Sequence, residues 1–318
     1  MKFQRLDKAI IPTLTQQELD ILEKEYGQIF SQSKEITDGI MNRTYQVTDN
    51  LILKKLNPIY PPEQIISSLN FQQHIAQTQG SAPNIILTKT KKLHLSILDN
   101  TFYVAKKVQI PKATSQTIPH IIQTLHNIHT SNWSKLVKSN TPLNEALQKD
   151  IQIIQSKLTE FQQAHNIQTK KLNDHLKNLK IQSELPHQEN LYANLHGDPN
   201  IQNTFIQKNK VFFIDFDRAK QGNPIEDYTR LIVSTLCKTP QVTQSNKIQL
   251  INLTKAIKHL EKEKILTPNE IKNLQIYLRF YISRKGSWEI LQTPNPTQEQ
   301  FDNMTANLMR HHEKLSPL

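Results

Sequence analysis

Side chains that can bind a metal ion, hold a phosphate or accept a proton gather in one stretch of the chain. The stretch 194–224 reads NLHGDPNIQNTFIQKNKVFFIDFDRAKQGNP and contains His196, Asp198, Asn203, Asp215 and Asp217. Asn203 follows Asp198 by five residues, and Asp215 follows it by seventeen. Phosphoryl transfer to a hydroxyl needs one carboxylate that takes up the hydroxyl proton, and further oxygen ligands that bind magnesium. The spacing therefore predicts phosphoryl-transfer chemistry.

The position of Asp215 favours this interpretation over a hairpin whose acids lie in solvent. The run NTFIQKNKVFFIDFD is typical of two short strands joined by a turn at 208–210. The residues VFFI directly before Asp215 should be buried, so this carboxylate ends a core strand. Glycine is scarce, with six residues in the chain, yet Gly197 and Gly222 both fall in this stretch.

The stretch resembles the catalytic loop of protein kinases, where H-R-D is followed by four residues, an asparagine and later D-F-G. Here the same positions read H-G-D, four residues, N, and then D-F-D. It is similar to the aminoglycoside phosphotransferase and choline kinase family, whose loop has His-Gly-Asp or His-Asn-Asp and whose next strand ends in Ile-Asp-Phe/Trp-Asp/Glu. The sequence QGNPIEDY continues the resemblance. It implies an α+β, bilobal protein-kinase-like fold with a small antiparallel-sheet N-lobe and a mainly helical C-lobe.

The resemblance also implies roles for residues in this stretch. The protein is expected to use ATP and Mg²⁺. Asp198 is expected to be the catalytic base, and Asn203 and Asp215 are expected to bind the Mg²⁺. Asp227 matches a family aspartate that supports the catalytic loop. His196 is expected to brace that loop through a backbone hydrogen bond rather than to transfer protons.

A second motif lies in the N-terminal part. DGIMNRTYQV resembles the family's Gly-x-x-Asn-x-x-Tyr turn over the phosphates, with Gly39 and Asn42 as the candidate contacts. The strand LILKKLN offers two lysines for the phosphates, and strand alternation puts Lys54 and Lys55 on opposite faces. We favour Lys55 and keep Lys54 as the alternative. Kinases pair this lysine with a glutamate on the next helix, where only Glu63 is available, and it could equally cap the helix.

Composition fits an ordinary globular protein. The chain has 318 residues, 36% hydrophobic and 21% charged, with a net charge of +11. The lysines are scattered and not interleaved with aromatic residues, so we expect no nucleic acid partner. No apolar run is long enough for a membrane span or a secretory signal. One cysteine, Cys237, excludes an internal disulfide, and a cytoplasmic location is expected.

Periodicity divides the chain into two parts. Residues 1–107 predict a helix at 15–30, short antiparallel strands and one inserted helix that starts at Pro62-Glu63. Residues 108–318 predict helices around the catalytic hairpin, with a helical insertion at 144–185. We expect the first part to be the nucleotide-binding lobe and the second to be the catalytic and acceptor-binding lobe, with a hinge near 105–112.

The acceptor is expected to be a small molecule. Barely a dozen residues separate Asp215 from the helix near Asp227, which leaves no room for the activation loop of a protein kinase. The motifs resemble hexosamine kinases and choline or ethanolamine kinases equally, so the candidate acceptors are an amino sugar, another sugar or a choline-like amino alcohol. Two alternatives stay open: a stress-response type Ser/Thr protein kinase of the same superfamily, and a non-catalytic nucleotide-binding protein.

Residues that contact the acceptor are harder to predict. The helix LRFYISRKGSWEIL carries aromatic and basic side chains that could bind an amine, although such a stripe is more often part of a core. The candidates are Asp217, Arg218, Arg284 and Trp288. The adjacent histidines in MRHHEK should point to different sides of a helix, and we interpret them as solvated.

Overall fold

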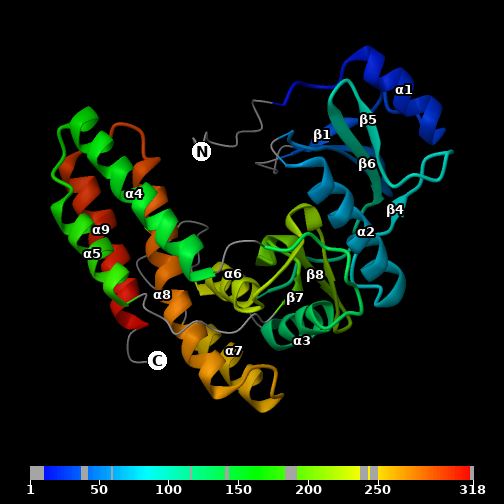
Figure 1. Ribbon diagram of the computed structural model, residues 1–318. Helices are drawn as coiled ribbons and strands as arrows, with labels where there is room; N and C mark the ends of the chain where they lie inside the picture. Colours follow the sequence, from blue (N-terminus) through cyan, green and yellow to red (C-terminus); the bar gives the residue numbers. More distant parts are fainter. Residues whose placement is uncertain are drawn as a thin grey trace. The chain divides into compact units, whose positions relative to one another are not determined.

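The protein is described by a computed structural model, which covers residues 11–36, 42–58, 60–114, 117–139, 143–182, 192–236, 243 and 250–315 (Figure 1). Its contacts divide the chain into two compact units. The first comprises Met1–Lys112, Ser131–Val137 and Asn203–Lys220; the second comprises Ala113–Thr130, Lys138–Gln202 and Gln221–Leu318. The predicted combination of an antiparallel-sheet part and a mainly helical part is confirmed. The lobe boundary at 107/108 stays a prediction.

The first unit is built on a six-stranded antiparallel sheet. Its strands are β1 (Lys34–Ile36), β2 (Arg43–Thr48), β3 (Leu51–Lys55), β4 (Ile85–Ile86), β5 (Leu95–Ile97) and β6 (Asn100–Lys106). They lie in the order β1-β2-β3-β6-β4, and β5 also pairs with β6. In the central pair, Lys54 lies opposite Tyr103 and Lys55 lies opposite Phe102.

Two helices of the first unit cover opposite faces of this sheet. Helix α1 (Gln16–Tyr26) buries Leu22 against the face that carries Leu53 and Phe102. Helix α2 (Pro62–Thr78) buries its apolar side chains against the face that carries Tyr103. Because side chains alternate along a strand, Lys54 lies on the α2 face and Lys55 on the α1 face.

A β-hairpin completes the first unit. It consists of β8 (Thr204–Gln207) and β9 (Lys210–Phe213), and the short 3-10 helix η4 (Phe216–Arg218) follows it. The ring of Phe216 packs edge-on against Phe71 of α2, with the centroids 6.0 Å apart. The hydroxyl of Ser68, also on α2, donates a hydrogen bond of 3.2 Å to the carbonyl of Ala219. The end of the hairpin is thus anchored on α2.

The second unit contains the catalytic-loop motif between helices. Strand β7 (Ala193–Leu195) pairs with β10 (Lys220–Gly222), and η3 (Ile201–Asn203) follows the motif. The neighbouring helices are α3 (Ile118–His129), α6 (Ile225–Leu236) and α7 (Leu250–Lys262), and α7 packs on both α3 and α6. Helix α3 also contacts β7, so the motif starts from a fixed strand.

Four further helices of the second unit pack side by side (Figure 1). They are α4 (Leu143–His165), α5 (Lys170–Gln182), α8 (Pro268–Leu291) and α9 (Gln298–Lys314). The helices expected in 144–185 are therefore present as α4 and α5. A Cβ atom at Gly286 of α8 would lie 2.5 Å from Leu308 of α9, so glycine permits this close approach. Helix α8 also packs on α6, which connects the four helices to the rest of the second unit.

Candidate active site

The β8–β9 hairpin brings Asn203 and Asp215 to the same end of the first unit. Asn203 immediately precedes β8, and Asp215 lies two residues after β9. Thr204 pairs with Phe213, and the amide of Ile214 donates a hydrogen bond of 3.0 Å to the carbonyl of Asn203. The two predicted metal ligands are thus adjacent because the strands that carry them are antiparallel.

The backbone of Asp215 is constrained. Its φ of 69° and ψ of 55° lie in the left-handed region, which costs a non-glycine residue about 1–2 kcal/mol. Aspartate tolerates this region better than most residues because its short polar side chain can bond locally. A strained backbone at a carboxylate is the kind of outlier that clusters at functional sites.

Lys54 is held by both carboxylates of the D-F-D motif. Its Nζ lies 2.6 Å from Oδ1 of Asp215 and 3.0 Å from Oδ2 of Asp217. The hydroxyl of Tyr103 donates a hydrogen bond of 3.3 Å to the other oxygen of Asp217. The side chain of Asp217 is only 3% exposed, whereas that of Asp215 is 36% exposed. One carboxylate of the pair is therefore internal, and the other is accessible.

Asn42 is the second residue that fixes Asp217. Its Nδ2 donates a hydrogen bond of 2.6 Å to Oδ2 of Asp217, and its Oδ1 accepts one of 2.9 Å from the amide of Asn57. Asn42 is buried, so these contacts lie inside the unit. The role of Asn42 in nucleotide binding stays a prediction, and Gly39 lies outside the described residues.

The electrostatics of this cluster follow from burial and opposite charge. Burial alone would lower the pKa of Lys54, but Asp215 and Asp217 outweigh it and raise that pKa well above its ordinary value. Burial raises the pKa of Asp217 to about 7, against the opposing effect of Lys54 and with a further contribution from Asp215. The ammonium thus stays charged, while Asp217 changes its charge near neutral pH.

Lys55 lies on the opposite face of the sheet, away from these carboxylates. Its Nζ forms an ion pair of 2.8 Å with Glu18 of α1, and both side chains are buried. Strand alternation predicted that the two lysines separate; the structure brings Lys54, not Lys55, to Asp215. Glu63 is exposed at the start of α2, and in the described part of the chain Lys54 is paired with aspartates rather than with a glutamate.

In the second unit, Asp227 of α6 holds the H-G-D turn at 196–198 by its backbone. Its carboxylate accepts hydrogen bonds from the amides of His196, at 2.8 Å, and Gly197, at 3.1 Å. Nε2 of His129 lies 3.0 Å from the same carboxylate. Burial would raise the pKa of Asp227, but the hydrogen bond and charge of His129, followed by His196, lower it below its ordinary value.

His196 and Gly197 shape the turn that leads to Asp198. Nδ1 of His196, which is fully buried, accepts a hydrogen bond of 3.2 Å from the amide of Asp198. This is the geometry that a bracing role for His196 requires. Gly197 has a φ of 88°, a conformation that other residues adopt only with strain. Glycine in H-G-D is therefore needed for the turn.

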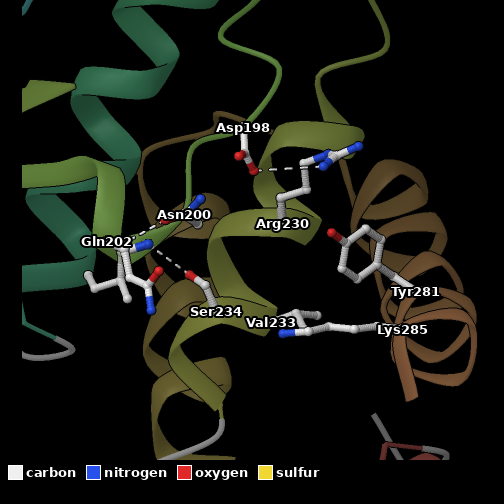
Figure 2. A pocket seen from close by; sticks show the side chains of 9 residues that line it. Asp198, Asn200, Gln202, Arg230, Val233, Ser234, Tyr281 and Lys285 are labelled. Atoms are coloured by element: carbon white, nitrogen blue, oxygen red, sulfur yellow. Dashed lines mark hydrogen bonds and ion pairs between the residues drawn. The ribbon is translucent and has the colours of Figure 1, made fainter. Parts of the chain in front are cut away.

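A cavity of about 190 Å³ opens beside Asp198 (Figure 2). Its wall includes Arg230, Val233 and Ser234 of α6, and Tyr281 and Lys285 of α8. Sequence reasoning did not select Arg230 or Lys285. Helical spacing gave a signal, since Arg230 follows Asp227 by three residues and Lys285 follows Tyr281 by four, but the packing of α6 on α8 was not predictable.

None of the predicted acceptor contacts lines this cavity. Asp217 is internal. Arg284 forms an ion pair of 2.6 Å with Asp150 of α4, and neither Arg284 nor Trp288 lines the cavity beside Asp198. Arg218 is half-buried at the end of η4. Their roles as acceptor contacts stay predictions.

The histidines of α9 correct one interpretation. His311 is fully buried, and the ring of His312 lies 4.9 Å from that of His175 in α5. The interpretation of both as solvated is wrong, because α9 packs against α5 and α8 and leaves neither histidine on an open face.

The described residues contain neither a membrane-spanning helix nor a ready-made metal cage. No helix there is both long enough and apolar enough to cross a bilayer. No three His, Cys, Asp or Glu side chains in that part of the chain form a cage for a metal ion. Magnesium does not need such a cage, because it retains waters and is commonly held by one or two carboxylates together with substrate phosphates.

Comparison with known sequences decides the family. The sequence profile of the phosphotransferase enzyme family matches residues 33–249, more than half of the chain. The chain belongs to this family. The predicted enzyme class is therefore confirmed: the protein is a phosphotransferase. A search of curated proteins finds no match.

Solved structures share the fold of this phosphotransferase. Amicoumacin kinase hAmiN in complex with AMP-PNP, Ca²⁺ and Ami is 15% identical, with a TM-score of 0.66 and coverage of 95% of this chain and 94% of that one. Spectinomycin phosphotransferase APH(9)-Ia with ADP and spectinomycin is 13% identical, with a TM-score of 0.65 and coverage of 97% and 100%. Choline kinase from Cryptosporidium parvum Iowa II is 11% identical, with a TM-score of 0.58 and coverage of 90% of each chain. The kinase-like fold is thus confirmed.

Proposed function

We propose that this phosphotransferase transfers the γ-phosphoryl group of ATP, with Mg²⁺, to a hydroxyl of a small molecule. The observation that carries the proposal is the contact of Lys54 with both carboxylates of the D-F-D motif. This contact places the ammonium of Lys54, which can bind phosphates, beside the accessible carboxylate of Asp215, which can bind a metal. The solved relatives with AMP-PNP and Ca²⁺, or with ADP, support the choice of nucleotide and divalent metal.

Asp198 is the catalytic base in this proposal. Its carboxylate is 28% exposed and lines the cavity, where it can accept the proton of an acceptor hydroxyl. The contacts of Asp227 and His196 with the loop backbone would hold it in place. A general base must lie within hydrogen-bond reach of the proton that it takes, so a fixed loop directly serves this role.

Asn203 and Asp215 would hold the metal. Both offer hard oxygen donors from the same end of the hairpin, and the carboxylate of Asp215 is accessible, which fits the ligand preference of Mg²⁺. Mg²⁺ bound there would neutralise negative charge on the phosphates. Lys54 would then bind the phosphates, while Asp217 keeps it in position.

The cavity beside Asp198 favours a small acceptor over a protein. Its volume of about 190 Å³ is below the ~300–1,000 Å³ of sites that bind drug-sized ligands. Helix α6 begins at Ile225, so little chain follows Asp215 from which a protein-substrate platform could form. Sugars, amino sugars and choline-like amino alcohols are the candidate acceptors, and a cytoplasmic location stays a prediction.

The test is turnover of ATP with Mg²⁺ and pooled small alcohols, compared with Asp198→Ala and Asp215→Asn. We expect ADP release that needs an acceptor and is lost in both variants, while both stay folded by circular dichroism. Transfer of label only to added protein would instead support a Ser/Thr kinase. Nucleotide binding without any turnover would support a non-catalytic protein.

A further inference from the structure

The cavity beside Asp198 carries more positive than negative charge. Its wall has two cationic side chains, Arg230 and Lys285, and one carboxylate, that of Asp198. The remaining wall residues are neutral. Figure 2 shows Arg230 on α6 directed toward Asp198, and Tyr281 and Lys285 extending from α8. The side chains that line the cavity thus carry one net positive charge, which favours an anion over a cation as the ligand.

Arg230 is placed to bind an anion. Its Nη1 lies 3.8 Å from Oδ1 of Asp198, longer than a hydrogen bond, so this ion pair is loose. Its guanidinium carbon lies 5.7 Å from the centroid of the Tyr281 ring, within the range of a cation–π contact. The side chain is 22% exposed. A partly exposed guanidinium can offer parallel N–H groups to a carboxylate or phosphate.

Lys285 adds a second, more accessible cation. Its side chain is 35% exposed, and Nζ lies 4.0 Å from Oε1 of Glu289 one turn later. Glu289 also accepts hydrogen bonds from the amide and hydroxyl of Thr243, so its charge is shared. The neighbouring Arg284 differs, because it is held by Asp150 at 2.6 Å. Lys285 thus presents charge to the cavity, whereas Arg284 does not line it.

We infer that the acceptor is a small hydroxyl compound that carries an anionic group, either a carboxylate or a phosphate. Arg230 and Lys285 bind that group while Asp198 takes the proton of a hydroxyl. The hydroxyl oxygen forms a bond to the γ-phosphorus of ATP, the bond from that phosphorus to the bridging oxygen breaks, and ADP leaves. The inference rests on the proposed function and narrows its acceptor class.

The same charges argue against cationic acceptors. The ammonium group of an amino sugar or the quaternary group of choline would lie beside two like charges, with one carboxylate to offset them. Like charges at an interface are a common means of rejecting wrong partners. A charge-assisted hydrogen bond gained or lost changes affinity by about 10- to 100-fold. We expect anionic acceptors to bind more tightly than cationic ones by a factor of this size.

The experiment uses one skeleton in several charge states. The probes are glucose, glucuronate, glucose 6-phosphate and glucosamine, and in parallel glycerol, glycerate, glycerol 3-phosphate and serinol. Binding to the full chain is measured by calorimetry, and transfer is measured as ADP release with ATP and Mg²⁺. We expect an anionic member to bind about tenfold or more tightly than its neutral and amine counterparts. Comparison of the carboxylate probes with the phosphate probes shows which of the two anionic groups the cavity prefers.

Variants connect this preference to the two cations. In Arg230→Gln and Lys285→Gln, the Kd of the anionic probe should rise about 10- to 100-fold, while the Kd of the neutral probe changes little. Arg230→Lys should retain part of the preference for anions, because it keeps the positive charge. This variant therefore tests the inference even if Arg230→Gln fails to fold. The matched controls are Lys272→Gln on the exposed face of α8 and Arg310→Gln on α9, which should behave like the unmodified protein.

The failures of the two proposals differ. Provided that ATP and Mg²⁺ still bind, three results overturn the inference alone. They are tightest binding by an amine or neutral probe, absence of binding by every anionic probe, and an anion preference that is unchanged in both Gln variants. Absence of ATP binding would instead remove the proposed function. Asp198→Asn should bind the anionic probe but not phosphorylate it, which separates recognition from proton transfer.

Discussion

Lys54 and Asp217 form an internal ion pair in the first unit, with Nζ 3.0 Å from Oδ2 and Asp217 only 3% exposed. Asn42 and Tyr103 hold the same carboxylate. Protein kinases position the corresponding lysine with a glutamate on the helix after the strand, but Glu63 at the start of α2 is exposed here. We propose that Asp217, two residues after Asp215, performs this positioning role.

The first prediction concerns Asp217→Asn. The variant keeps the side-chain volume but loses the charge that holds Lys54, so the KM for ATP should rise about 10- to 100-fold. Stability near pH 7 should change little, because the amide oxygen of Asn can still accept from Asn42 and Lys54 and its NH₂ group can donate to the hydroxyl of Tyr103. Steady-state kinetics and thermal melting measure the two effects.

A pH profile distinguishes positioning from a merely structural role. As pH rises through about 7, Asp217 in the unmodified protein loses its proton and holds Lys54 more firmly, so the KM for ATP should fall. In Asp217→Asn this dependence should disappear. A profile that is the same in both proteins would contradict the assignment.

The second prediction separates the two adjacent lysines. Lys55 and Glu18 form a buried ion pair 2.8 Å apart, so Lys55→Met leaves an uncompensated buried charge, a change that costs about 3–5 kcal/mol. Lys54→Met should abolish turnover at a smaller cost in stability, since Asp217 can take up a proton near neutral pH. Urea unfolding and ADP release of both variants provide the measurement.

The Glu18→Gln/Lys55→Met double variant is the control. Removing both charges should recover most of the stability lost in Lys55→Met, because no buried charge is left unpaired. If Lys55→Met loses turnover while it retains full stability, the assignment of the phosphate role to Lys54 is wrong.

These lysines mark the limit of what the sequence could predict. Strand periodicity correctly predicted that Lys54 and Lys55 face opposite sides of the sheet, because alternation is a local property of the backbone. Which side carries the site depends on Glu18 of α1 and Asp217 of η4. Both partners are distant in sequence, so local pattern could not choose between the lysines.

The same distinction holds for the rest of the molecule. The antiparallel sheet and the helices at 144–185 follow from hydrophobic periodicity, and the hairpin that joins Asn203 to Asp215 follows from strand and turn signals. Arg230 and Lys285 could not be selected, because they meet at the cavity through the packing of α6 on α8. Helix–helix packing depends on tertiary contacts that one sequence does not reveal.

The third prediction concerns the support of the catalytic loop. The carboxylate of Asp227 accepts three hydrogen bonds. In Asp227→Asn, the NH₂ group of the amide would face donors, so one buried N–H would have no partner. This should lower the free energy of unfolding by about 1–3 kcal/mol. We expect kcat to fall tenfold or more with the KM for ATP unchanged. Asp174→Asn on the exposed face of α5 is the matched control. A rise in the KM for ATP at constant kcat would contradict a role confined to the loop.

The fourth prediction is a loss of stability in acid that depends on His175 and His312. Their rings lie 4.9 Å apart between α5 and α9, and Nε2 of His175 is 3.0 Å from the hydroxyl of Ser283 in α8. Burial, followed by His175 and Arg279, lowers the pKa of His312 to about 4. Burial also lowers the pKa of His175, against an opposing effect of Glu313.

The sign follows from proton uptake. A histidine with a pKa of about 6.5 when unfolded binds its proton first in the unfolded chain. The free energy of unfolding is therefore at its full value above pH 6.5 and falls as pH drops toward 4, by up to about 3 kcal/mol for His312. Urea unfolding between pH 7.5 and 4.5 measures this slope. His312→Leu should reduce this slope to the part that His175 contributes, because an apolar side chain needs no proton, whereas His120→Gln at an exposed position of α3 should leave it unchanged. An equal slope in His312→Leu and the unmodified protein would mean that acid unfolding begins at other groups.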